Sequence, residues 1–186
     1  MGCVSSSVES KYEISNMVKE SDFIDKRIDN VEEFNLNDQL ILARVVDVYD
    51  CNTLICIINV CDKFYRFKIK LAEVDMENIK NKEHQYYNKE VAKVNRNVLY
   101  TLITNDKTIN AYEGKTYIIE KLKSKCYLVK LYCCNFDKNG MLIAYVFNKN
   151  FIFNNIENNK GLIQYNKTFS YNYYLIDQDL ALYYNK

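Results

Sequence analysis

The chain has 186 residues, a formal net charge of +1, and a composition that is 48% hydrophobic and 26% charged. This length suits one folded domain with appended segments, and the composition is that of a globular protein. A single histidine, seven cysteines without a Cys-x-x-Cys pair and no long apolar run argue against a zinc site, a Cys-His protease site and a membrane-spanning helix. We therefore expect reduced, mostly buried cysteines, as in a cytosolic environment.

The first six residues form an acylation signal. Removal of Met1 exposes Gly2, and the hydroxyl of Ser6 completes the pattern for N-myristoylation. Cys3, beside Gly2, is a natural site for palmitoylation, and two acyl chains anchor a protein far more stably than one. Because both modifications are eukaryotic, residues 1–6 predict a protein on the cytoplasmic face of a membrane, in a eukaryotic cell or one infected by a virus.

An acidic spacer arm follows, over residues 7–39. Residues 7–38 contain nine acidic and four basic side chains, a net charge of −5, so the rest of the chain carries +6. Apolar residues are scattered along the arm, which predicts at most a short helix. The mildly basic remainder is compatible with nucleic-acid binding and equally with an ordinary solvated surface.

The domain begins at Leu40 with strand patterns. Segments 40–49 and 53–60 are rich in Val, Ile and Leu and flank a polar turn, which predicts a hairpin of buried strands. Segment 65–71 alternates apolar with basic residues and predicts a strand with one basic face. The basic positions are Arg66, Lys68 and Lys70.

The second half of the domain combines a helix with two more strands. Apolar residues recur at helical spacing over 83–103, whereas 127–134 and 142–148 have strand character and are joined by Asp-Lys-Asn-Gly, a strong turn signal. Between them, residues 104–125 are either an extra hairpin or an extension of the helix. A short helix over 151–159 is predicted to end at Gly161.

The order of these elements favours a closed, five-stranded barrel of the OB type with helices, in the α+β class. Short antiparallel strands arranged around one helix are typical of that fold. The OB fold commonly binds nucleic acid, but a fold alone does not establish a function.

Four stretches of the chain resemble the staphylococcal nuclease, or thermonuclease, family. In order, 45–54 resembles its first turn, 67–75 its third strand, 136–146 the turn before its last strand, and 154–165 its closing helix. The resemblance implies a nuclease-like barrel over residues 40–166, with a helix between the second and third stretches. It leaves residues 167–186 as a tyrosine-rich C-terminal tail.

The resemblance also implies a catalytic site that has lost most of its groups. The family cleaves DNA or RNA with one calcium ion, held by two aspartates that correspond to Asn52 and Asp75. Its two charge-stabilising arginines correspond to Lys70 and Met141, and the glutamate that activates water corresponds to Asn78. Because methionine is uncharged and an amide cannot act as a base, we expect weak Ca²⁺ binding and little catalysis.

Two nearby carboxylates keep the register of this assignment open. Asp50 lies two residues before Asn52, and Glu77 lies one residue before Asn78. A shift of one or two residues would restore a carboxylate at either position.

Three functional hypotheses follow from the sequence. The first is a membrane-anchored, nuclease-like module that binds nucleic acid or another anion through Arg66, Lys68 and Lys70. The second is an active calcium-dependent nuclease held at a membrane. The third is a scaffold whose tyrosine-rich tail binds a protein partner.

Overall fold

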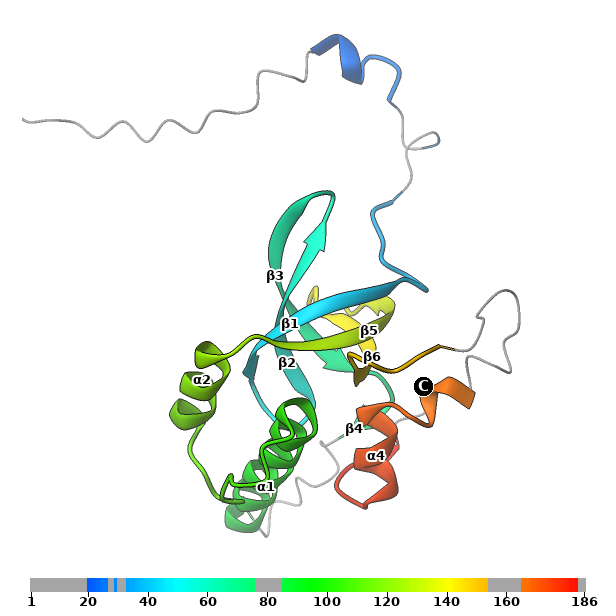
Figure 1. Cartoon of the computed structure of the whole chain (residues 1–186). Helices are drawn as coiled ribbons and strands as arrows, with labels where there is room; N and C mark the ends of the chain where they lie inside the picture. Colours follow the sequence, from blue (N-terminus) through cyan, green and yellow to red (C-terminus); the bar gives the residue numbers. More distant parts are fainter. Residues whose placement is uncertain (1–19, 27–28, 30–32, 76–84, 154–164, 184–186) are drawn as a thin grey trace, which may run out of the picture. The chain divides into compact units, whose positions relative to one another are not determined.

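The computed structural model describes residues 20–26, 29, 33–75, 85–153 and 165–183 (Figure 1). The chain divides into two units, residues 1–34 and 35–186. In the first unit a short 3₁₀ helix, η1, spans Glu20–Phe23. The predicted lipidation positions Gly2 and Cys3 lie outside the described residues.

The second unit is built on a closed five-stranded barrel. Its strands run in the order β1-β2-β3-β6-β5, and every neighbouring pair is antiparallel except β3 and β6, which are parallel. This confirms the prediction of an OB-like α+β barrel. The strands are β1 (Leu40–Val48), β2 (Thr53–Val60), β3 (Lys63–Leu71), β5 (Tyr127–Phe136) and β6 (Leu142–Asn148).

The barrel interior is filled by the apolar side chains that alternate along these strands. Leu54, Ile58 and Ile69 are fully buried, and Leu131 and Val146 meet them from β5 and β6. A bulge between Val45 and Asp47 interrupts the pairing of β1 with β2. Such bulges increase local bending and help a small barrel to close.

Helix α1 (Gln85–Thr104) packs against the barrel, as the helical spacing over 83–103 predicted. Leu99 and Tyr100 are fully buried in the same core as the strands. The helix ends at Thr104, because the next residue, Asn105, has a left-handed φ of 56° that breaks the helical geometry. The backbone N–H of Asn105 still bonds to the Thr101 carbonyl, which satisfies one of the free acceptors at the helix end.

The segment 104–125 is neither a hairpin nor a continuation of α1. After the break at Asn105 the chain forms a link and then a separate helix, α2 (Lys115–Ser124), which buries Ile118 and Leu122. Side chains of α1 fix this link: Asn97 donates to the carbonyls of Asn110 (3.0 Å) and Ala111 (2.8 Å). Both alternatives predicted for this segment, an extra hairpin and an extension of the first helix, are therefore wrong. The segment instead forms a second helix that packs on β1.

The C-terminal segment completes the barrel unit. Residues 151–153 are not helical, and the rest of the helix predicted over 151–159, with Gly161, lies outside the described residues. Helix α4 (Tyr171–Asp177) packs on β6, and β7 (Leu182–Tyr183) pairs with the short β4 (Val74–Asp75). The segment separated as a tail in the sequence thus contributes two elements to the same unit.

Asn172, at the start of α4, joins this segment to the barrel. Its buried amide group donates to the carbonyls of Ala72 (2.9 Å) and Ala144 (3.1 Å) and accepts the backbone N–H of Val146 (2.9 Å). The amide therefore satisfies three backbone groups beside the end of the β3–β6 ladder, where β3 no longer pairs with β6.

Replacing Asn172 should strongly destabilise the domain. We expect Asn172→Ala to lower the free energy of unfolding by about 2–4 kcal/mol, because it removes the side-chain partner of the Ala72 carbonyl and of the Val146 N–H. Urea denaturation followed by circular dichroism measures this change. The control Asn59→Ala, at an exposed position of β2, should stay within about 0.5 kcal/mol of the wild type; an equal destabilisation of the two variants would contradict the role of Asn172.

Candidate functional site

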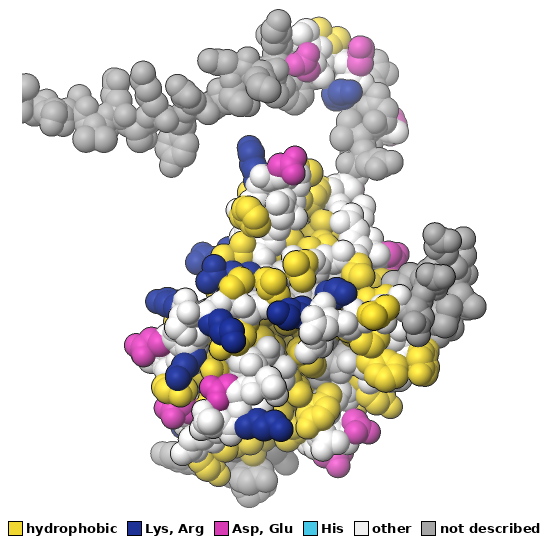
Figure 2. All heavy atoms as spheres, viewed as in Figure 1, with side chains coloured by type: hydrophobic (Ala, Val, Ile, Leu, Met, Phe, Trp, Pro, Cys, Tyr) yellow, Lys and Arg dark blue, Asp and Glu magenta, His cyan; other side chains and the backbone are white. Residues whose placement is uncertain are grey.

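The three basic residues of β3 lie on the outer face of the barrel. Arg66 and Lys68 are exposed and Lys70 is half-buried, while the intervening Ile69 points into the core. Across the β2–β3 ladder these residues face Ile57, Ile55 and Thr53, respectively. The alternation along 65–71 therefore predicted the basic face correctly. Figure 2 shows one face of the molecule, on which Lys and Arg side chains are interspersed with hydrophobic ones.

A fourth cation joins this face from α2. The Lys115 ammonium lies 3.9 Å from the centroid of the Tyr49 ring, and the Lys68 ammonium lies 5.5 Å from the same centroid. Tyr49 follows the end of β1 and is itself exposed. Lysines from two distant elements thus meet at one aromatic ring.

Asp47 holds Lys115 in this position. Its Oδ2 lies 3.3 Å from the Lys115 ammonium, and the residue is only 9% exposed. Its Oδ1 is buried and accepts no hydrogen bond from the described residues. The negative charge of Asp47 also acts on Arg96 of α1. Burial lowers the pKa of the Arg96 guanidinium, and the charge of Asp47 opposes that lowering.

Arg96 connects this charge cluster to the α1–α2 link. Its guanidinium donates to Asn97 Oδ1 (3.1 and 3.0 Å) and to the carbonyl of Glu113 (2.5 Å). Since Glu113 lies two residues before Lys115, this contact fixes the start of α2 and with it the position of the lysine. The sequence did not identify Lys115 or Tyr49 as site residues, because their approach depends on how α2 packs on β1.

The turn between β1 and β2 places Asn52 beside Lys70. The Asn52 carbonyl accepts the N–H of Leu71 (2.8 Å), and Thr53 pairs directly with Lys70. Asn52 Oδ1 accepts the Thr53 hydroxyl (3.0 Å), and Asp50 Oδ1 accepts the Asn52 backbone N–H (3.0 Å). One oxygen of each side chain is thus engaged within the turn.

Met141 lies directly before β6, the strand that pairs with β3 at Lys70. Ile143 of β6 pairs with Lys70, and Met141 precedes Ile143 by two residues. The turn before it is closed by Asp137, whose Oδ1 accepts the N–H groups of Asn139 and Met141, both at 2.9 Å. Gly140, with a φ of 74°, supplies the left-handed residue that this turn requires.

The remaining predicted positions follow β3. Asp75 lies in β4, opposite Leu182 of β7 and four residues after Leu71. Asn78 and its alternative Glu77 lie outside the described residues. The structure therefore places Asn52 one residue before the strand partner of Lys70 in β2 and Met141 two residues before its partner in β6. The predicted base lies outside the described residues.

The described parts of the chain show no cluster of carboxylates of the kind that holds a calcium ion. Calcium takes six to eight oxygen ligands, several of them carboxylates. In the described parts of the chain, no three His, Cys, Asp or Glu side chains are grouped so that they could hold a metal ion. The amide at Asn52 replaces one of the carboxylates that the nuclease resemblance implies.

No protein-family model, curated protein or solved structure matches this chain. Among the described helices, none has the length and apolar character needed to cross a membrane. The case for a function therefore rests on the residues of this chain.

Proposed function

We propose that this chain is a membrane-anchored, nuclease-like domain that binds nucleic acid on the outer face of β3 and α2 and has little or no catalytic activity. The observation that carries the proposal is the meeting of Lys68 and Lys115 at the Tyr49 ring. Together with Arg66 and Lys70, they form a group that we call the basic face.

The geometry of the basic face suits a polyanionic strand. Residues two apart on a strand lie about 6.5 Å from each other on the same side, so Arg66, Lys68 and Lys70 form a regular row of positive charges. Lys115 adds a further positive charge beside Lys68, across the Tyr49 ring. An exposed aromatic ring between cations suits a strand that offers both phosphates and flat bases.

The same positions support weak catalysis at most. Lys70 keeps a charge but lacks the two-pronged geometry of a guanidinium. Met141 provides no charge to stabilise a transition state, and Asn52 supplies no carboxylate. Binding without cleavage is therefore the function that these residues support best.

Oligonucleotide binding should depend on the basic face and on salt. Full-length protein carrying Gly2→Ala, which prevents acylation, is titrated with labelled single-stranded DNA and RNA in a fluorescence anisotropy assay. Changing Arg66, Lys68 and Lys115 to Gln should weaken binding at least about tenfold. The plot of log affinity against log salt concentration should also become less steep, by about 0.7 for each phosphate that the variant no longer neutralises. A control with Lys107, Lys123 and Lys149 changed to Gln should bind nearly as well as the parent. Equal binding by both triple variants, or no binding by the parent at low salt, would refute the basic face as a nucleic-acid site.

Cleavage should be slow. With calcium, we expect the purified protein to cut a labelled oligonucleotide at least about a thousandfold more slowly than an intact member of the nuclease family. The combined change Asn52→Asp, Lys70→Arg, Asn78→Glu and Met141→Arg should restore measurable cleavage, whereas single changes should restore little. Brisk wild-type cleavage abolished by Asp75→Ala would favour the active nuclease instead.

If there is neither cleavage nor salt-dependent binding, the scaffold hypothesis is favoured.

Membrane attachment should depend on both N-terminal positions. In eukaryotic cells Gly2→Ala should move the protein into the soluble fraction, because no acyl chain can be added there. Cys3→Ser should leave it weakly and reversibly bound through one chain. Cell fractionation followed by immunoblotting measures both effects, and a Gly2→Ala protein that stays fully with membranes would contradict the lipid anchor.

A further inference from the structure

The tip of the β2–β3 hairpin exposes two adjacent aromatic side chains. Phe64 is 74% exposed and Tyr65 is 49% exposed. Phe64 lies on the outer face with Arg66, whereas Tyr65 belongs to the opposite face, which reaches the core further along at Ile69. Successive side chains of a strand point to opposite faces of the sheet, so within the barrel one of two neighbours is buried. At the tip of the hairpin neither Phe64 nor Tyr65 is buried.

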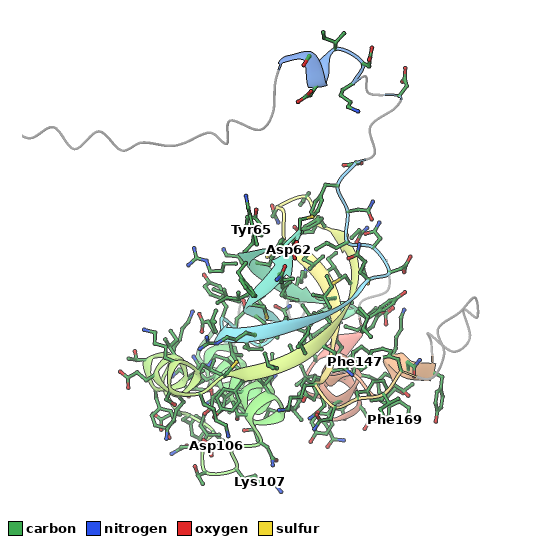
Figure 3. All side chains as sticks on the ribbon, turned by 45° about the horizontal axis from the view of Figure 1, so that its top comes forward. Asp62, Tyr65, Asp106, Lys107, Phe147 and Phe169 are labelled. Carbon is green, nitrogen blue, oxygen red and sulfur yellow. The ribbon has the colours of Figure 1, made fainter. Side chains whose placement is uncertain are left out.

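The hairpin holds these aromatics on a stiff support. Residue pairs are continuous from Thr53–Lys70 to Val60–Lys63. The two loop residues, Cys61 and Asp62, both have positive φ angles, 50° and 62°. This is the signature of a type I′ turn, whose twist matches that of the flanking strands. The hairpin extends from the barrel in Figure 1, and Figure 3 labels Asp62 and Tyr65 at its tip.

Two basic side chains, the exposed acidic side chain of Asp62 and a further apolar group surround the tip. Lys63 and Arg66 flank the aromatic pair, and both are exposed. Leu42 of β1 is 54% exposed; extending the Ala43–Ile58 register by one residue places it beside Asn59, which pairs with Phe64.

Exposure on both faces of the hairpin distinguishes between possible partners. A nucleic-acid strand or a folded protein lying on the outer face would cover Phe64 and leave Tyr65 exposed. A lipid interface has depth, so it can surround the tip and take up both rings at once. Aromatic side chains favour that interface, and nearby Lys and Arg are attracted to anionic headgroups.

We propose that the tip of the β2–β3 hairpin inserts into the headgroup region of a membrane that contains anionic lipids. Phe64 and Tyr65 enter the interface, while Lys63 and Arg66 contact lipid phosphates. This lipid contact does not require the acyl anchor, and Arg66 is the one residue that it shares with the basic face.

The absence of tryptophan from the sequence allows a direct test. Full-length protein with Gly2→Ala, which cannot be acylated, receives Phe64→Trp as its only tryptophan, and Tyr112→Trp, at an exposed position of the α1–α2 link, provides the control. Vesicles of phosphatidylcholine with phosphatidylserine should shift the emission of the Phe64→Trp protein to shorter wavelength and leave the control unchanged. The shift should be smaller with phosphatidylcholine alone. An unchanged emission of the Phe64→Trp protein would overturn the proposal.

Removal of the aromatic pair provides a second test in the same Gly2→Ala background. We expect Phe64→Ser with Tyr65→Ser to reduce cosedimentation with the anionic vesicles at least about tenfold, and Lys63→Gln with Arg66→Gln to remove the preference for them. The matched control Tyr112→Ser with Tyr174→Ser should bind within about twofold of its parent. Circular dichroism checks that each variant is folded.

Two further results would overturn the lipid assignment. One is unchanged vesicle binding by the folded aromatic variant. The other is weaker oligonucleotide binding by that variant with vesicle binding intact, which would assign the tip to nucleic acid. Because vesicle and oligonucleotide binding are measured separately, failure of this proposal is distinguishable from failure of the proposed function.

Discussion

The parallel pairing of β3 with β6 is the contact on which the barrel and its candidate site depend. It joins only three residue pairs, Ile69–Leu142, Lys70–Ile143 and Leu71–Ala144. This short ladder closes the sheet, and it also brings Lys70 to the strand that Met141 directly precedes. Beyond it, the amide of Asn172 takes over the backbone partners that β3 no longer provides. The closure thus depends on a side chain from a segment outside the five strands.

Much of the barrel could be predicted from local patterns in the sequence. The five strands were found because β-branched and apolar residues alternate or run together between clear turn signals, as at the Asp137 turn, where the structure shows the expected left-handed Gly140. The helix over 83–103 was also found, because its apolar residues recur at helical spacing over many residues. Such signals are strong because they are repeated within one element.

The elements that were missed depend on tertiary contacts. Helix α2 has only ten residues and buries only Ile118 and Leu122, a short pattern that resembles an extension of α1. The break between the helices comes from the left-handed Asn105 and from the hydrogen bonds of Arg96 and Asn97 to the link. For the same reason Arg66, Lys68 and Lys70 could be grouped from the sequence, whereas Lys115 could not. Only the packing of α2 on β1 brings it to Tyr49 and Asp47.

The position of Asn172 in the sequence has a consequence for synthesis of the protein. The residue lies after every barrel strand, and its bond to Ala72 spans 100 positions of the chain. β1 likewise finds its partner β5 only after α1 and α2 have been made. Contacts of such long sequence separation slow folding. On the ribosome, the β1–β2–β3 sheet therefore emerges with unpaired edges at both β1 and β3, and the barrel reaches its final form only when α4 has emerged.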